Sequence, residues 1–323
     1  MDAASRRPQL WFQERRYADG LQTVDGILLL QNVHRLLEGE MLANAEPRRR
    51  LNAAATALRL GGAGAEQGVL HALIRSVFTR TGCLGARGLV EDESAPASEV
   101  RALCDESLRS RSAERLPAIA AFEIPYGIEL FDAWLRGAFE MPDLSALQPP
   151  GGAAGTPPGP GARIAQLGRE LFGRTGAPPA AELAGYLERM RRVAELEPAD
   201  AVELHRAIRE VDRESDGPID AGAWHVYHRR LAELDAARAL ARVALAAAEF
   251  REREGRWPES LDALAPMFPE GVPVDPFDRR PFDYALTDGK ARISARGRFE
   301  DAGPERSEKE RRELALVWSL EAR

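Results

Sequence analysis

Apolar residues recur at three- and four-residue steps through most of the first 140 residues, a spacing typical of amphipathic helices. The longest such stretch covers residues 20–43 and stops before Pro47, which is expected to break it. Further helices are expected over 48–60, 65–83, 97–110, 113–122 and 126–140, with breaks at Gly61-Gly62, over 85–96 and at Pro125. We therefore predict an all-helical bundle for residues 1–144.

Residues 145–162 contain the run QPPGGAAGTPPGPG, which is almost entirely proline, glycine and small residues. Such a composition cannot bury a core, so we predict a linker that separates the bundle from the rest of the chain.

The pattern changes again towards the C-terminus. An alanine-rich helix is expected over 229–254, ended by Gly255. Residues 281–287 and 290–296 predict a hairpin turning at Asp288-Gly289, and alternation over 314–320 predicts a third strand with one buried face. The fold class is thus mainly α, with a C-terminal α+β module over 234–323 in which a long helix packs on a small antiparallel sheet.

The amino-acid composition and net charge bear on the class of protein and on its partners. The chain has 323 residues, 44% hydrophobic and 29% charged, which indicates a folded globular protein. A net charge of −7 argues against nucleic acid as a partner. No apolar run approaches the length that spans a bilayer, and the sequence as given begins without the apolar stretch of a signal peptide.

An acidic loop between two expected helices has the ligand spacing of a calcium site. Hard cations prefer oxygen ligands at alternating loop positions, with glycine at a sharp turn in position 6. Gly217 occupies that position. The candidate ligands at positions 1, 3, 5, 7 and 9 are Asp212, Glu214, Asp216, Pro218 through its carbonyl, and Asp220.

The stretch IREVDRESDGPID, with its flanking helices, resembles the second member of a calmodulin-type EF-hand pair. The preceding ARIAQLGRELFGRTGAPPAAELAGYLERM resembles a first EF-hand whose loop has lost its acids, so the lobe would cover 163–233. Position 12 departs from the family, because Ala223 replaces the bidentate glutamate. Two alternatives follow: a weakened calcium site, or a degenerate lobe kept for its packing.

The segments AAAEFREREGRWPESLDALAP and VPVDPFDRRPFDYAL, within residues 235–300, resemble the globular part of a type II secretion major pseudopilin. The resemblance implies a sheet packed on the long helix, with Trp257 and Phe277 closing the ends of that layer. It also implies a periplasmic or cell-envelope location. The apolar assembly helix of the family has no counterpart here, and residues 296–303, where the family has an acidic calcium loop, carry two arginines. The fold therefore carries over and the metal does not.

Cysteine and histidine leave alternatives open. Cys83 and Cys104 are either two separate, partly buried thiols or a disulfide, which would stabilise the fold by roughly 3 kcal/mol. His225 and His228 lie three residues apart without a third ligand at suitable spacing, so surface or partly buried histidines are expected. His34, His71 and His205 have no partner motif.

No known phosphate-binding, metalloprotease or nucleophile-elbow motif is present in the sequence. The leading hypothesis is accordingly a non-catalytic interaction or structural protein with protein partners, associated with a secretion or pilus-like envelope assembly. A calcium-responsive EF-hand module is the first alternative. An enzyme whose site is assembled from dispersed residues of the bundle is the second.

Overall fold

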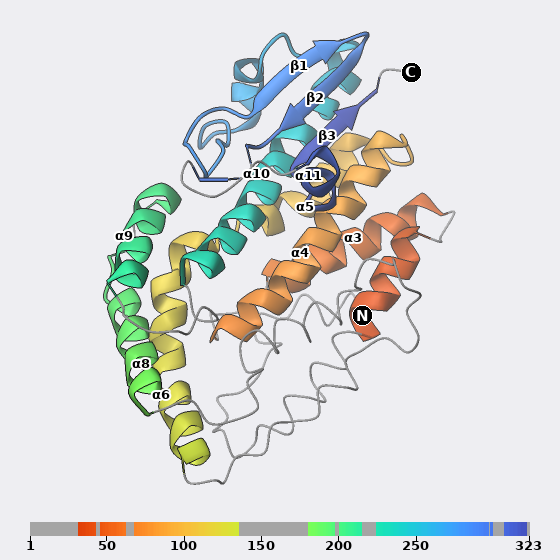
Figure 1. Cartoon of the computed structure of the whole chain (residues 1–323). Helices are drawn as coiled ribbons and strands as arrows, with labels where there is room; N and C mark the ends of the chain where they lie inside the picture. The colour runs from red at the N-terminus through yellow and green to blue at the C-terminus, as the bar shows by residue number, and fades with distance from the viewer. Residues whose placement is uncertain are drawn as a thin grey trace.

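The computed structural model describes residues 32–42, 46–62, 68–135, 180–197, 200–214, 224–296, 298–299 and 307–321. Within these ranges the protein is mainly helical, with a three-stranded antiparallel sheet near the C-terminus (Figure 1). The predicted fold class is confirmed.

Residues 32–42 are helical, and further helices follow. These helices are α3 (Pro47–Gly62), α4 (Gly68–Glu91), α5 (Ala97–Leu108), α6 (Leu116–Leu135), α8 (Ala180–Ala194), α9 (Ala201–Arg213), α10 (Trp224–Glu254) and α11 (Glu308–Glu313). Two 3₁₀ helices, η2 (Ala113–Arg115) and η5 (Leu261–Met267), connect them, and the strands are β1 (Asp283–Thr287), β2 (Lys290–Ser294) and β3 (Val317–Leu320).

Helix α10 lies at the centre of the fold. It contacts α4, α5 and α9 along its length and the sheet near its C-terminal half (Figure 1). Alanines such as Ala237, Ala241 and Ala244 are fully buried, and their small side chains let the neighbouring helices approach closely. Gly255, with φ of +70°, ends the helix as the sequence predicts.

Helices α3 and α4 pack closely at two glycines. A Cβ on Gly61 of α3 would lie 2.1 Å from Thr79 Oγ1, and one on Gly82 of α4 would lie 2.9 Å from the Leu58 backbone nitrogen. Both distances are shorter than any real contact, so only glycine allows this approach of the two helices.

A buried ion pair joins four segments at the centre of the bundle. Arg238 is 1% exposed and donates to Asp235 at 3.1 Å, to the Gly61 carbonyl at 3.2 Å and to Thr79 Oγ1 at 3.0 Å. Asp235 also accepts the backbone N–H of Ser112 at 2.7 Å. Burial raises the pKa of Asp235, and the adjacent Arg238 guanidinium opposes that rise.

Two predicted helix breaks are wrong. Helix α4 continues through Gly85 to Glu91, because Ala86 and Leu89 are fully buried and this packing outweighs the poor helix propensity of glycine. Pro125 lies inside the single helix α6, although proline removes one hydrogen bond of the helix. Ala121 and Pro125 are both exposed, so water can reach the carbonyl that loses its partner.

The hairpin is confirmed as predicted. β1 pairs with β2 from Asp283↔Ser294 to Thr287↔Lys290, and Asp288 and Gly289 turn the chain with φ of 51° and 75°. Positive φ at both turn residues is the geometry that Asp-Gly favours. β2 then pairs antiparallel with β3.

The third strand is shorter than predicted. Ser307 and Glu310 form a capping box that begins helix α11, and Ala315, with φ of 58°, turns the chain before β3 starts at Val317. Strict alternation also fails, since Leu316, Val317 and Trp318 are all buried. Helices α4 and α10 both contact β3, in which Ser319 alone is partly exposed.

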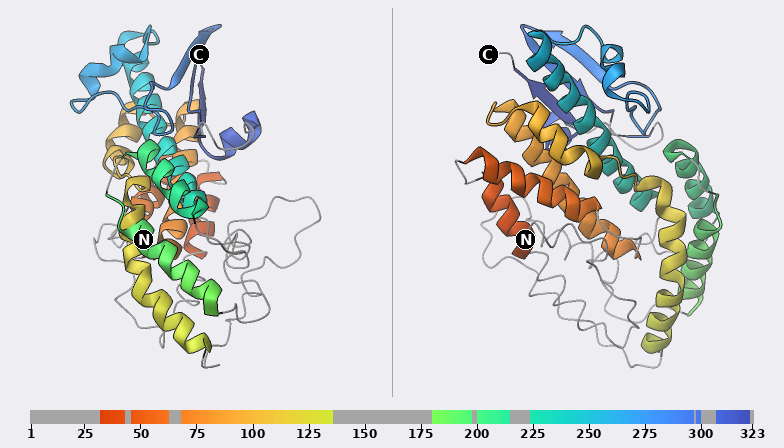
Figure 2. Two further views of the ribbon diagram at one scale, coloured as in Figure 1. Left: turned by 60° about the vertical axis from the view of Figure 1, so that its left-hand side comes forward. Right: turned by 180° about the vertical axis from the view of Figure 1, so that it is seen from behind.

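Helices α6, α8 and α9 line one side of the molecule, with α3 on the other side of α10 (Figure 2). Other predictions fall outside the described residues: the helix over 20–31, the linker 145–162, and the helix ending at Leu171-Phe172. The predicted border between residues 233 and 234 falls inside α10, which runs unbroken from 224 to 254.

Candidate functional site

The corner after α10, residues 255–258, fixes the position of the β1–β2 hairpin. The Trp257 indole N–H donates to the Gly289 carbonyl at 2.8 Å, and the Tyr284 hydroxyl donates to the Pro258 carbonyl at 2.7 Å. The Arg251 guanidinium lies 4.9 Å from the Trp257 ring centroid, a cation–π contact. The Gly-Arg-Trp-Pro corner therefore holds both ends of β1.

A buried carboxylate organises the loop that precedes the sheet. Asp275 accepts the backbone N–H of Phe277 at 3.0 Å and that of Arg296 at 2.6 Å, which ties the loop to the strand end. Burial raises the pKa of Asp275 to about 6. On the outer side of the loop, Arg279 forms an ion pair with Asp200, the N-cap of α9.

The two edges of the sheet differ. The outer edge of β3 faces α4, where Glu91 accepts the Ser319 N–H at 2.8 Å and Arg87 donates to the Val317 carbonyl at 3.2 Å. Side chains thus satisfy backbone groups that an edge strand otherwise leaves free.

β1 is the opposite edge, and all of its residues except Tyr284 are exposed. The two-residue turn makes Thr287 and Lys290 a hydrogen-bonded pair, so alternation directs the N–H and C=O groups of Tyr284 and Leu286 away from β2. Among the described residues, no strand pairs with this edge. The edge can accept an additional strand.

The structure describes part of the predicted calcium loop. Asp212 and Glu214 lie at the end of α9, whereas Asp216, Pro218 and Asp220 lie outside the described residues, as does Ala223. Asp212 uses both carboxylate oxygens at the start of α10. Oδ1 accepts the Trp224 N–H at 3.2 Å, and Oδ2 accepts the His225 N–H at 2.8 Å.

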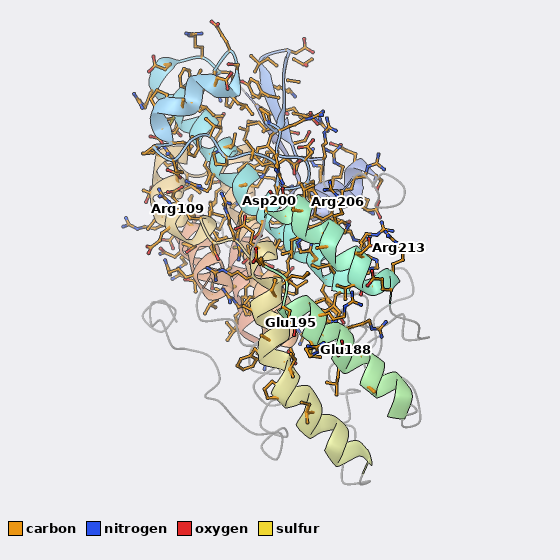
Figure 3. All side chains as sticks on the ribbon, turned by 90° about the vertical axis from the view of Figure 1, so that its left-hand side faces the viewer. Arg109, Glu188, Glu195, Asp200, Arg206 and Arg213 are labelled. Atoms are coloured by element: carbon orange, nitrogen blue, oxygen red, sulfur yellow. The ribbon has the colours of Figure 1, made fainter. Side chains whose placement is uncertain are left out.

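Glu214 forms an ion pair with Arg192 of α8. Within the described ranges, no group of three or more His, Cys, Asp or Glu side chains is placed to hold a metal. Figure 3 shows charged side chains on this side of the molecule: Glu188 on α8, Glu195 just after it, Asp200 as the N-cap of α9, and Arg206 and Arg213 on α9.

A histidine stack forms where α9 meets α10. The His205 ring stacks on Phe299 with centroids 3.9 Å apart, and the His228 ring lies 5.6 Å from Phe299 and 5.5 Å from His205. Phe277 meets Phe299 edge to face at 4.9 Å. The expectation of a surface or partly buried His228 is wrong, because this side chain is 0% exposed.

Little in the sequence predicts this stack, since its members come from three separate segments. His205 lies on the buried face of α9 among Leu204 and Ile208, and this 3.6-residue pattern is the one signal that could have found it. Nothing in the spacing joins it to Phe299.

The histidine and cysteine side chains that the structure describes in the bundle, His34, Cys83 and Cys104, are all buried. His34 is buried and its Nε2 lies 2.7 Å from Thr81 Oγ1, while the His71 side chain lies outside the described residues. Cys83 and Cys104 are free, fully buried thiols, which corresponds to the first of the two cysteine alternatives. Burial raises both thiol pKa values to about 12, so neither is a ready nucleophile.

Comparison of the chain with models of known protein families, with curated proteins and with solved structures found no match. The search of the described helices for one long and apolar enough to cross a membrane also found none.

Proposed function

We propose that this protein is a non-catalytic component of a secretion or pilus-like assembly of the cell envelope, which docks onto another protein through its C-terminal module. The observation that carries the proposal is the exposed β1 edge. An extended segment of a partner that pairs with this edge gains main-chain hydrogen bonds, and the side chains around it supply specificity.

The contrast between the two sheet edges favours docking at β1. Side chains of Glu91 and Arg87 bond the outer edge of β3, whereas β1 carries the exposed apolar side chain of Leu286 on an edge with which no other described strand pairs. β1 contains no lysine or proline, the residues that commonly protect an exposed edge.

Hydrogen bonds that hold β1 in place also favour a docking role for this edge. Tyr284 and Trp257 fix the hairpin to the corner after α10, so the edge is held in place before a partner arrives. Such preorganisation reduces the entropy lost on binding. The likeness of the module to a major pseudopilin points to a pseudopilin-type protein of the same envelope as the partner.

The test is a calorimetric titration of this chain with the purified major pseudopilin of the same organism. We expect saturable binding that Leu286→Arg weakens by about tenfold or more, since a charge at the edge opposes strand pairing. Leu103→Arg is the matched control, because Leu103 lies on α5 and is 41% exposed against 47% for Leu286.

Absence of binding, or equal weakening by the two variants, would reject the proposal. Sedimentation of the protein alone provides a second check. If it forms a dimer that Leu286→Arg dissociates, the occupant of the edge is a second copy of this chain rather than an envelope partner.

A further inference from the structure

The histidine stack joins α9 to the C-terminal module through a fully buried contact. His205 of α9 is 4% exposed and packs flat on Phe299, which in turn contacts Phe277 of the loop before the sheet. His228 of α10 completes the stack. Two consecutive helices and the segments that carry Phe277 and Phe299 therefore meet at two imidazole rings.

His228 is suited to this contact only when it is neutral. Neither of its ring nitrogens has a hydrogen-bond partner within the described residues, so a proton there would place an unpaired charge in the interior. Burial, and secondarily the neighbouring His205, lower the pKa of His228 to about 3.

The charged and titratable groups around the stack offer little compensation. On the helices these are His225 and Asp212, and the Asp212 carboxylate already accepts two N–H groups at the start of α10. From the loops they are Asp275, whose carboxylate accepts two backbone N–H groups and whose raised pKa of about 6 leaves it mostly neutral at pH 5, and Arg298, which is exposed and positive.

The other polar contact between α9 and the loop is at the surface. Arg279 pairs there with Asp200 and Glu203 while all three side chains remain partly exposed, and solvent screening weakens such pairs. The ring stack is thus the buried contact that holds α9 to Phe277 and Phe299.

We propose that the stack of His205, His228 and Phe299 is an acid-sensitive contact, which holds α9 against the C-terminal module at neutral pH and releases it when the His228 ring takes up a proton. In the released state the His228 ring reaches water and binds a proton as an ordinary histidine does. Release is local, because the Arg238–Asp235 pair and the α3–α4 contact do not involve these rings.

The direction of the effect follows from the lowered pKa of His228. The closed state binds this proton only near pH 3, whereas the released state binds it near pH 6.5. The stability of the closed state is therefore complete above pH 6.5 and falls as the pH drops towards 3. Between pH 7 and pH 5, His228 alone raises the ratio of released to closed molecules roughly 25-fold.

The experiment measures the distance between spin labels placed at Arg206→Cys on α9 and Thr287→Cys on β1, both exposed positions. Labelling at pH 7 spares Cys83 and Cys104, which are fully buried. The full chain is then compared at pH 7 and pH 5, with far-UV circular dichroism to follow global unfolding. His228→Leu removes the titrating ring without losing a hydrogen bond, and His228→Gln serves if the leucine variant does not fold.

We expect the distance distribution to broaden at pH 5 in the parent protein with helix content retained, and to stay narrow in the His228 variant. His34→Gln, which removes a buried histidine elsewhere, should behave as the parent. An unchanged distribution at pH 5, equal broadening in the His228 variant, or loss of helix content at the same pH would each overturn the proposal.

Discussion

The Glu91 carboxylate of α4 accepts a hydrogen bond from the Ser319 N–H of β3, with 2.8 Å between Oε1 and the nitrogen. This contact joins the N-terminal helices to the last strand, 228 residues further along the chain. It also occupies a backbone donor at the edge of the sheet, where another chain could otherwise pair.

Replacing Glu91 tests what that contact contributes. Glu91→Ala leaves a partly buried N–H without its acceptor, which is expected to cost about 1–3 kcal/mol and to speed hydrogen exchange of the Ser319 amide about tenfold. Glu91→Gln keeps the acceptor oxygen and should retain most of the protection. Equal exchange rates in the two variants would show that the charge, rather than the hydrogen bond, matters.

Breaking the buried ion pair of Arg238 and Asp235 should lower the free energy of unfolding more than Glu91→Ala does. Arg238→Met leaves the Asp235 carboxylate buried without its cation, so the free energy of unfolding should fall by about 3–5 kcal/mol in denaturant titrations. Arg256→Met breaks an exposed pair with Glu259 and should cost less than about 1 kcal/mol. Similar losses in both variants would contradict a central role for Arg238.

Much of the helical fold was predictable because local sequence determines it. The 3.6-residue pattern places α3, α5 and α10 close to their observed bounds, and the Asp288-Gly289 turn fixes the hairpin register. One error arose where tertiary packing overrode local preference, at Gly85 inside α4. The other arose at Pro125 inside α6, where solvent can reach the carbonyl that the proline leaves without a partner.

The candidate sites were less accessible to sequence reasoning. The histidine stack and the closed edge of β3 depend on residues such as His205, Phe299 and Glu91, whose partners lie on other elements. No local spacing encodes those contacts. The acidic loop after Asp212 was visible in the sequence, yet the Asp212 carboxylate turns out to bind the first N–H groups of α10.

Two glycines of α4 should respond in opposite ways to alanine. Gly82→Ala places a Cβ 2.9 Å from the Leu58 backbone nitrogen, so the helices must separate, and we expect a loss of about 1–3 kcal/mol. At Gly88 the nearest atom is Arg50 Nη2 at 3.7 Å, an ordinary contact, so Gly88→Ala should stabilise by up to about 1 kcal/mol. Thermal unfolding of both variants checks the difference; equal shifts would argue against close α3–α4 packing.

Stability should fall in mild acid, in part through His34. Burial lowers its pKa to about 4, with Arg80 and Arg35 adding to the effect. The His34 ring therefore stays neutral in the folded state between pH 6.5 and 4, whereas in the unfolded state it takes up a proton below about pH 6.5. The stabilisation is present above pH 6.5 and is lost between 6.5 and about 4. His34→Gln can still bond to Thr81 and should reduce the pH slope of stability by up to about 1.4 kcal/mol per pH unit there. An unchanged slope would contradict this assignment.

Calcium should leave the wild-type protein unaffected. Ala223 supplies no carboxylate where an EF-hand loop has its bidentate glutamate, and both Asp212 oxygens already accept hydrogen bonds from α10. We therefore expect no heat and no change in Tm on adding millimolar calcium, measured by calorimetry. Ala223→Glu restores the missing ligand and should raise Tm in calcium if the loop keeps its EF-hand form. A response of the wild-type protein itself would instead establish the acidic loop as a working site and favour the calcium-responsive alternative.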